Sequence, residues 1–71
     1  MIPGYYVRIA AFLTELLRPV GLDHDLPADP RWIKAGLAAL IQNGIATKED
    51  LKLAAVRGYD VIIREDLFPE E

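Results

Sequence analysis

The sequence predicts an all-α domain, a small orthogonal bundle of three helices near residues 3–18, 30–43 and 47–57, followed by a short helix or strand near 60–67. Two observations support this fold class. Apolar residues recur at three- and four-residue steps along the helical segments, which is the spacing of one helix face. Residues that start and end helices stand at the segment boundaries. The whole chain, 1–71, is expected to form one domain.

The first expected helix, 3–18, has the clearest periodicity. Its apolar positions are Tyr5, Tyr6, Ile9, Phe12, Leu13, Leu16, Leu17 and Val20. At 100° per residue they cover about 160° of the helix surface, an arc wide enough to contact two neighbours. The opposite side, which includes Thr14 and Arg18, is expected to face solvent. Pro19 and Gly21 end the pattern.

The second expected helix, 30–43, has well-marked ends. Asp29 can cap a free amide of the first turn, and Pro30 stands where a missing N–H is harmless. The pair Asn43-Gly44 is typical of a left-handed helix ending. The main apolar stripe consists of Ile33, Leu37, Leu40 and Ile41, and the flank beside it of Trp32, Gly36, Ala39 and Asn43. Small residues in this flank favour close approach of a neighbouring helix.

The third helix is expected to begin at Thr47, whose hydroxyl caps the amide of Asp50 while that carboxylate reaches back, and to end at Gly58. One face of this helix is formed by Leu51, Ala54, Ala55 and Gly58. Leu53 and Val56 point elsewhere, so the helix has two apolar aspects. One of these aspects needs a second partner.

The segment near 60–67 has two alternatives. Its Val61–Ile63 run favours a strand, whereas Asp60 could cap a short helix. A single strand would have no partner within this chain and would leave an unpaired edge. A short fourth helix is therefore preferred, with the strand kept open as the alternative.

The size of the chain favours self-association. A domain of 71 residues is small enough that a single core only just outweighs chain entropy. The chain has no cysteine for disulfides, and its single histidine cannot build a structural zinc site. Oligomerisation is the remaining source of stability. A hydrophobic fraction of 52% leaves apolar surface for a partner.

The residue inventory argues against an enzyme. The chain has no serine or cysteine, and its two threonines, Thr14 and Thr47, have no evident base beside them. His24 lies between Asp23 and Asp25, where a carboxylate could tune it for acid–base work, but no second group is placed to orient it. A solvated loop histidine is the expected reading. The glycines are scattered and the usual metal-ligand spacings are missing, so no cofactor or metal is expected.

The charge distribution allows a helix-turn-helix DNA-binding regulator as the alternative function. The chain carries −3 overall, but residues 29–58 carry five basic against three acidic residues, and residues 59–71 one basic against five acidic. The third helix would then contact DNA through Lys48, Lys52 and Arg57. These cations have acidic neighbours, so the electrostatic footprint for phosphate is thin, and nucleic acid is disfavoured.

The favoured hypothesis is a non-enzymatic protein–protein interaction module, an adaptor or regulator that associates with itself. Its partner is expected to contact Leu53 and Val56 on the third helix, or the acidic C-terminal segment 64–71, in which Leu67 and Phe68 would be the anchors. The charged residues of the second and third helices are expected only to keep the exposed helix surfaces hydrated.

A cytoplasmic location is expected. The longest apolar stretch, 9–17, contains Thr14 and Glu15 and is far shorter than a membrane span. The N-terminus has no basic region of the kind that precedes a signal sequence. The lack of cysteine fits a reducing compartment.

Overall fold

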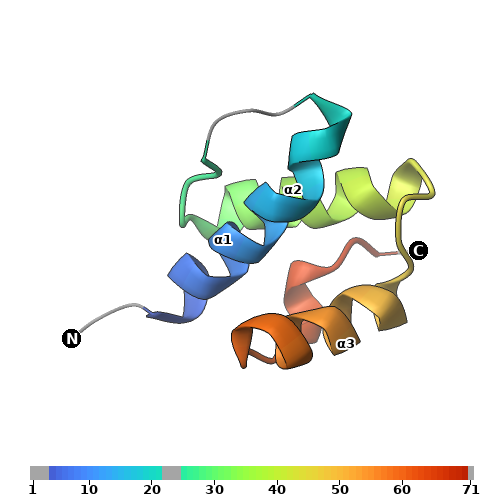
Figure 1. The fold of residues 1–71 in the computed structure, drawn as a ribbon. Coiled ribbons are helices and arrows are strands. Elements are labelled where there is room, and N and C mark those ends of the chain that lie inside the picture. The colour runs from blue at the N-terminus through green and yellow to red at the C-terminus, as the bar shows by residue number, and fades with distance from the viewer. Residues whose placement is uncertain (1–3, 22–24, 71) are drawn as a thin grey trace.

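The computed structural model describes residues 4–21 and 25–70, and within them the all-α prediction is confirmed. The elements are α1 (Gly4–Leu17), the 3-10 turn η1 (Arg18–Val20), α2 (Pro30–Gln42), α3 (Lys48–Tyr59) and the 3-10 turn η2 (Glu65–Leu67). These residues contain no strand. Helix α1 packs on both α2 and α3, and the C-terminal segment runs back between α2 and α3 (Figure 1). The three helices and this segment enclose one core.

Helix α1 changes to a 3-10 turn at Arg18 and then ends at Gly21. Gly21 has φ 104° and its N–H donates to the Arg18 carbonyl at 3.2 Å, so the expected ending is confirmed. The tighter turn carries Val20 away from the apolar arc in which the sequence placed it, and this side chain is 55% exposed.

Thr14 corrects the expected polar side of α1. Its side chain is buried, not solvated. The hydroxyl donates to the Ala10 carbonyl at 2.7 Å and accepts from the Leu26 N–H at 2.9 Å. Both hydrogen-bonding roles of the hydroxyl are thus used inside the fold, which removes the usual cost of burying it. Thr14 thereby ties α1 to the segment that leads into α2.

Helix α2 has the ends that the sequence predicts. The Asp29 carboxylate accepts from the Arg31 N–H at 2.8 Å, and this hydrogen bond lowers the pKa of Asp29. At the other end the Ile45 N–H donates to the Leu40 carbonyl at 3.0 Å, and Gly44 takes φ 71°. This pair of features is a Schellman motif, which directs the chain into α3.

Gly36 lets α1 approach the backbone of α2 closely. A Cβ atom at this position would lie 3.3 Å from Leu13 Cδ1 and 3.5 Å from Leu26 Cδ2. The close approach expected from the small residues of this flank is therefore observed at Gly36. Trp32, from the same flank, is instead 54% exposed.

Helix α3 starts as predicted but ends later. Thr47 and Asp50 form a reciprocal capping box, with the Asp50 N–H donating to Thr47 Oγ1 at 3.1 Å. The expected end at Gly58 is wrong, because the helix continues through it to Tyr59 and Asp60 takes the left-handed conformation (φ 54°, ψ 46°). The buried face is also narrower than expected: Leu51 and Ala55 are buried, whereas Ala54 and Gly58 are exposed.

The C-terminal segment forms less regular structure than the sequence suggested. Of the helix expected near 60–67 only η2 forms, and residues 61–64 have no regular secondary structure. Burial alternates along them, with Val61 and Ile63 buried and Ile62 73% exposed. The left-handed Asp60 reverses the chain, so the segment must lie extended to cover the helices.

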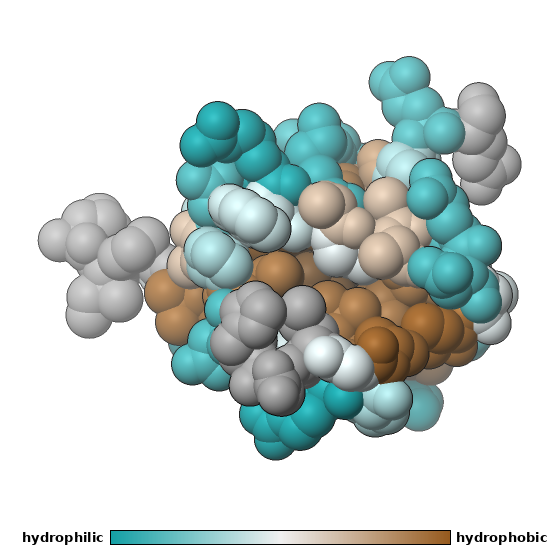
Figure 2. Space-filling model, turned by 90° about the horizontal axis from the view of Figure 1, so that it is seen from above, coloured by the Kyte–Doolittle hydropathy of each residue, from teal (hydrophilic) through white to brown (hydrophobic). Residues whose placement is uncertain are grey.

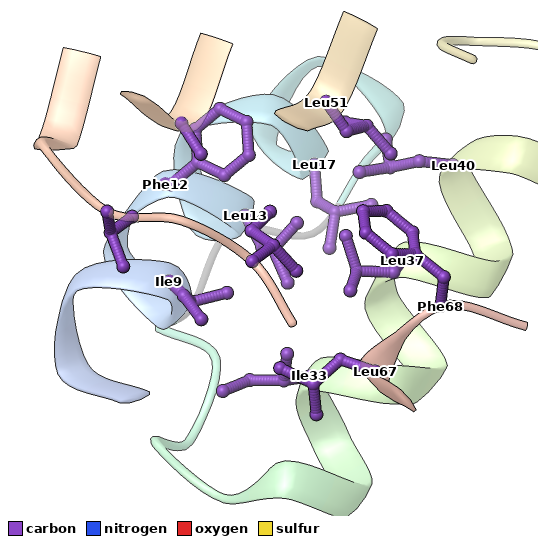
Figure 3. Packing of buried hydrophobic residues seen from close by; sticks show 13 residues of the cluster. Ile9, Phe12, Leu13, Leu17, Ile33, Leu37, Leu40, Leu51, Leu67 and Phe68 are labelled. Carbon is purple, nitrogen blue, oxygen red and sulfur yellow. The ribbon is translucent and has the colours of Figure 1, made fainter. Parts of the chain in front are cut away.

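The core is completed by that segment. Its members are Ile9, Phe12, Leu13, Leu17, Ile33, Leu37, Leu40, Leu51, Ala55, Val61, Ile63, Leu67 and Phe68. In Figure 3, Leu67 points toward Ile33 and Phe68 toward Leu37, so the C-terminal residues fill space next to α2. Four of the thirteen core side chains therefore come from residues 61–68.

The alternating burial at 62 and 63 yields a matched pair of substitutions. Ile63→Ala should lower the free energy of unfolding by about 2–5 kcal/mol, because it removes a buried side chain and leaves a cavity. Ile62→Ala should change it by no more than about 0.5 kcal/mol. Urea denaturation followed by circular dichroism measures both. Equal losses in the two variants would contradict the packing of this segment.

Candidate functional site

Residues 61–68, called the tail from here on, are held at one end by Tyr5 of α1. The Tyr5 hydroxyl donates to the Ile62 carbonyl at 2.9 Å and accepts from the Arg64 N–H at 2.7 Å. One side chain thus satisfies two backbone groups that an extended segment would otherwise leave to water.

Arg64 adds a second set of contacts to the same end of α1. Its guanidinium donates to the Tyr6 hydroxyl at 2.6 Å and lies 5.3 Å and 5.4 Å from the ring centroids of Tyr5 and Tyr6. These distances fall within the range of cation–π attraction. The two tyrosines, which the sequence assigned to the apolar arc of the first helix, therefore also clasp the tail.

Glu65 fixes the middle of the tail to α3. Its carboxylate accepts from Lys48 and, at 2.5 Å, from Lys52. The two lysines lower the pKa of Glu65 to about 2, and the hydrogen bond from Lys52 to Glu65 raises the pKa of that lysine. Two of the three cations expected to contact DNA are thus already paired within the chain.

The other cationic contacts further reduce what α3 could offer to phosphate. Lys48 also lies 5.3 Å from the ring centroid of Phe68. Arg57 is exposed and makes no ion pair with any of residues 4–21 or 25–70. One guanidinium on α3 without an ion pair among the described residues is a small footprint for a nucleic acid.

An apolar surface lies on the side of α3 away from the core. Leu53 and Val56, one helical turn apart, are 50% and 44% exposed, and Ile62 of the tail is 73% exposed. Val56 and Ile62 line one groove of about 550 Å³. The other residues that line the groove are Gly4, Tyr5, Arg8, Asp60 and Val61. Leu53, Val56 and Ile62 are called the α3 apolar face below.

The sequence identified part of this face. Leu53 and Val56 were expected to meet a partner, and the structure leaves both of them exposed. Ile62 was missed, because a Val-Ile-Ile run gives no sign of which residue faces outward until its backbone course is known. The alternation of burial in an extended segment supplies that information.

The expectation for the tail anchors has to be revised. Leu67 and Phe68 are 1% and 4% exposed, so neither is available to a partner in this conformation. They do act as anchors, but their site lies on the same chain. The reason is that the turn at Asp60 returns the tail to the helices.

A second apolar area lies between the end of α1 and the end of α2. Val20 and Ile45, 55% and 45% exposed, line a groove of about 470 Å³ together with Leu17, Ala39 and Asn43. Seen from above, apolar surface gathers on the right, the side of the α2–α3 turn (Figure 2). Neither residue was singled out from the sequence, because Val20 fits the arc of α1 and Ile45 fits a turn.

Other kinds of site find little support. His24 lies outside the described residues. Within residues 4–21 and 25–70 no three histidine, aspartate or glutamate side chains are grouped so that they could hold a metal ion. None of the helices described is long and apolar enough to cross a bilayer.

Comparisons with protein-family models, curated proteins and solved structures find no match for this chain. What the chain does is therefore inferred from its own surface.

The Tyr5 hydroxyl can be tested by its removal. Tyr5→Phe should lower the free energy of unfolding by about 1 kcal/mol, because it leaves the Ile62 carbonyl and the Arg64 N–H without their partner. Tyr59→Phe is the control, since the Tyr59 hydroxyl forms no hydrogen bond with any described residue. Thermal denaturation of both variants measures the difference. If Tyr5→Phe lowered the free energy of unfolding less than Tyr59→Phe does, the stabilising role of the Tyr5 hydrogen bonds would be contradicted.

The Glu65 ion pairs predict a pH dependence. Because the pKa of Glu65 is lowered from 4.5 to about 2 in the folded chain, its stabilisation is present above pH 4.5 and is lost as pH falls toward 2. Glu65→Gln should therefore melt a few degrees below the parent chain at pH 7. This difference in melting temperature should disappear as the pH falls from 4.5 to 2. Glu15→Gln, on exposed α1 surface, should show no such trend. A difference in melting temperature between Glu65→Gln and the parent chain that stays the same at every pH would contradict the ion pairs of Glu65 with Lys48 and Lys52.

Proposed function

We propose that this chain is a non-enzymatic helical protein-interaction module, an adaptor or regulator that associates with itself through the α3 apolar face. The observation that carries the proposal is the exposure of Leu53, Val56 and Ile62, of which Val56 and Ile62 line a groove. Aliphatic side chains grouped beside a concave surface favour protein contact, whereas single exposed ones need no explanation.

Charge around the groove supports a second copy as the partner. Arg8 and Asp60 both line it, so the surface carries one charge of each sign. In a two-fold contact the same surface meets itself, and Arg8 of one copy can lie opposite Asp60 of the other. A rim of a single sign would repel its own copy. Glu65, Asp66 and Glu70, which contribute to the net charge of −3, do not line this groove.

The size of the molecule is compatible with such a contact. A stable interface buries about 800 Å² on each partner, roughly a sixth of the 4879 Å² accessible surface of this chain. The α3 apolar face would form the centre of the buried area, where a few apolar anchors carry most of the binding free energy. The charged groups would lie at its rim.

DNA binding receives less support from the same surface. Lys48 and Lys52 are paired with Glu65, which leaves Arg57 as the α3 cation available to a phosphate. Releasing the lysines would break contacts that hold the tail. The helix-turn-helix alternative is therefore not proposed as a second function.

Charge introduced into the α3 apolar face should weaken self-association through that face. Leu53→Glu and Val56→Glu should each raise the dimer dissociation constant at least about tenfold, because a carboxylate would be buried against an apolar partner surface. Sedimentation equilibrium measures the constant. The fold should survive, since both side chains are about half exposed.

The matched control is Val20→Glu, a similarly exposed aliphatic residue that lines a different groove. It should leave the dissociation constant unchanged. A parent chain that stays monomeric at all concentrations up to about 1 mM, where binding is weaker than about 4 kcal/mol, would overturn the proposal. So would an equal effect of the control.

A further inference from the structure

We propose that the tail is an exchangeable docking segment: the site that holds residues 61–68 on α1, α2 and α3 also accepts the tail of a second copy, which gives a domain-swapped dimer. This inference goes beyond the proposed function, because it uses the buried tail site and not the α3 apolar face. Its partner is a second copy of this chain.

The tail is bound as a peptide is bound to a protein. Its backbone pairs with no strand, and among the described residues it bonds the helix backbone only where it leaves α3, where the Val61 N–H donates to the Ala55 carbonyl at 3.3 Å. From α1, the Tyr5 hydroxyl bonds the backbone of Ile62 and Arg64. The rest of its attachment comes from buried side chains and from Glu65 between Lys48 and Lys52. Contacts of this kind do not depend on whether the segment belongs to the same chain.

Charge complementarity specifies the segment. The site offers two lysines, which the Glu65 carboxylate of the tail pairs with, and the Tyr6 hydroxyl, which accepts from the Arg64 guanidinium. An exchanged tail would restore each of these contacts, together with the buried positions of Leu67 and Phe68. The closed monomer and the swapped dimer therefore differ mainly at the connection between α3 and the tail.

That connection favours opening. Asp60 is the only non-glycine residue with positive φ among those described, a backbone conformation that costs free energy for a side chain other than glycine. An extended connection in a swapped dimer would release this strain. The residue returns to an ordinary conformation once it no longer has to reverse the chain.

Gly58 weakens the same connection without a packing reason. A Cβ atom at this position would meet nothing within 4 Å, and its φ is not positive. The closed fold therefore does not require glycine here, yet glycine destabilises the last turn of α3 relative to alanine. Gly58, two residues before Asp60, thus eases the unwinding of the helix end.

Refolding at high concentration tests the exchange, because the tail must leave its site before another can enter. The parent chain, Asp60→Gly, Gly58→Ala and Asp60→Val are refolded from denaturant at millimolar concentration, and dimer fractions are measured by gel filtration with light scattering. Asp60→Gly should lower the dimer fraction severalfold, because glycine adopts the left-handed turn of the closed monomer more easily. Gly58→Ala should lower it by a similar factor, because alanine stiffens the end of α3. Asp60→Val should raise it, since a β-branched residue strongly disfavours positive φ.

The contacts of the dimer identify its type. Isotope-filtered NMR on a mixture of labelled and unlabelled chains should show contacts between Leu67 of one copy and Ile33 of the other. Leu53→Glu should leave this dimer intact, which separates the result from the proposed function. Equal dimer fractions in the parent chain, Asp60→Gly and Gly58→Ala would overturn the exchange even if Asp60→Val failed to fold. Intermolecular contacts confined to the α3 apolar face would overturn it as well.

Discussion

Docking of residues 61–68 onto the three helices is the interaction on which the rest of this structure depends. The tail supplies four of the thirteen core side chains, and its site is formed jointly by α1, α2 and α3. Without it the apolar faces of the helices would meet water on one side. The chain thereby encloses a core at a size where three short helices alone would bury little.

The helix ends could be predicted from the sequence because each depends on residues close together in the chain. The Asp29 cap, the capping box at Thr47 and the Gly44 ending are all local hydrogen-bond arrangements. The course of the tail could not be predicted in the same way. It depends on Asp60 adopting the left-handed conformation, which is uncommon for residues other than glycine, and on a hydroxyl 57 residues away that bonds Ile62.

The same distinction explains what the sequence indicated about function. The two apolar aspects of α3 follow from helical periodicity, so Leu53 and Val56 were identifiable as outward-facing. The pairing of Lys48 and Lys52 with Glu65 was not, because it requires the tail to return to α3. When the tail returns to α3, Glu65 neutralises the two lysines that made this helix look basic. The tail, which the sequence suggested would bind another protein, instead binds the helices of its own chain. Of the apolar side chains of α3, Leu53 and Val56 remain exposed.

The claim that the tail is an integral part of the folded unit is tested most directly by native-state hydrogen exchange. The amide groups of Arg64, Leu67 and Phe68 are all hydrogen-bonded, as is that of Leu51 in α3. If the tail completes the core, these four amides should exchange with the same free energy of opening, equal to that of global unfolding. Fast exchange at Arg64, Leu67 and Phe68 with Leu51 still fully protected would contradict it, because the helices would then be stable with the tail released.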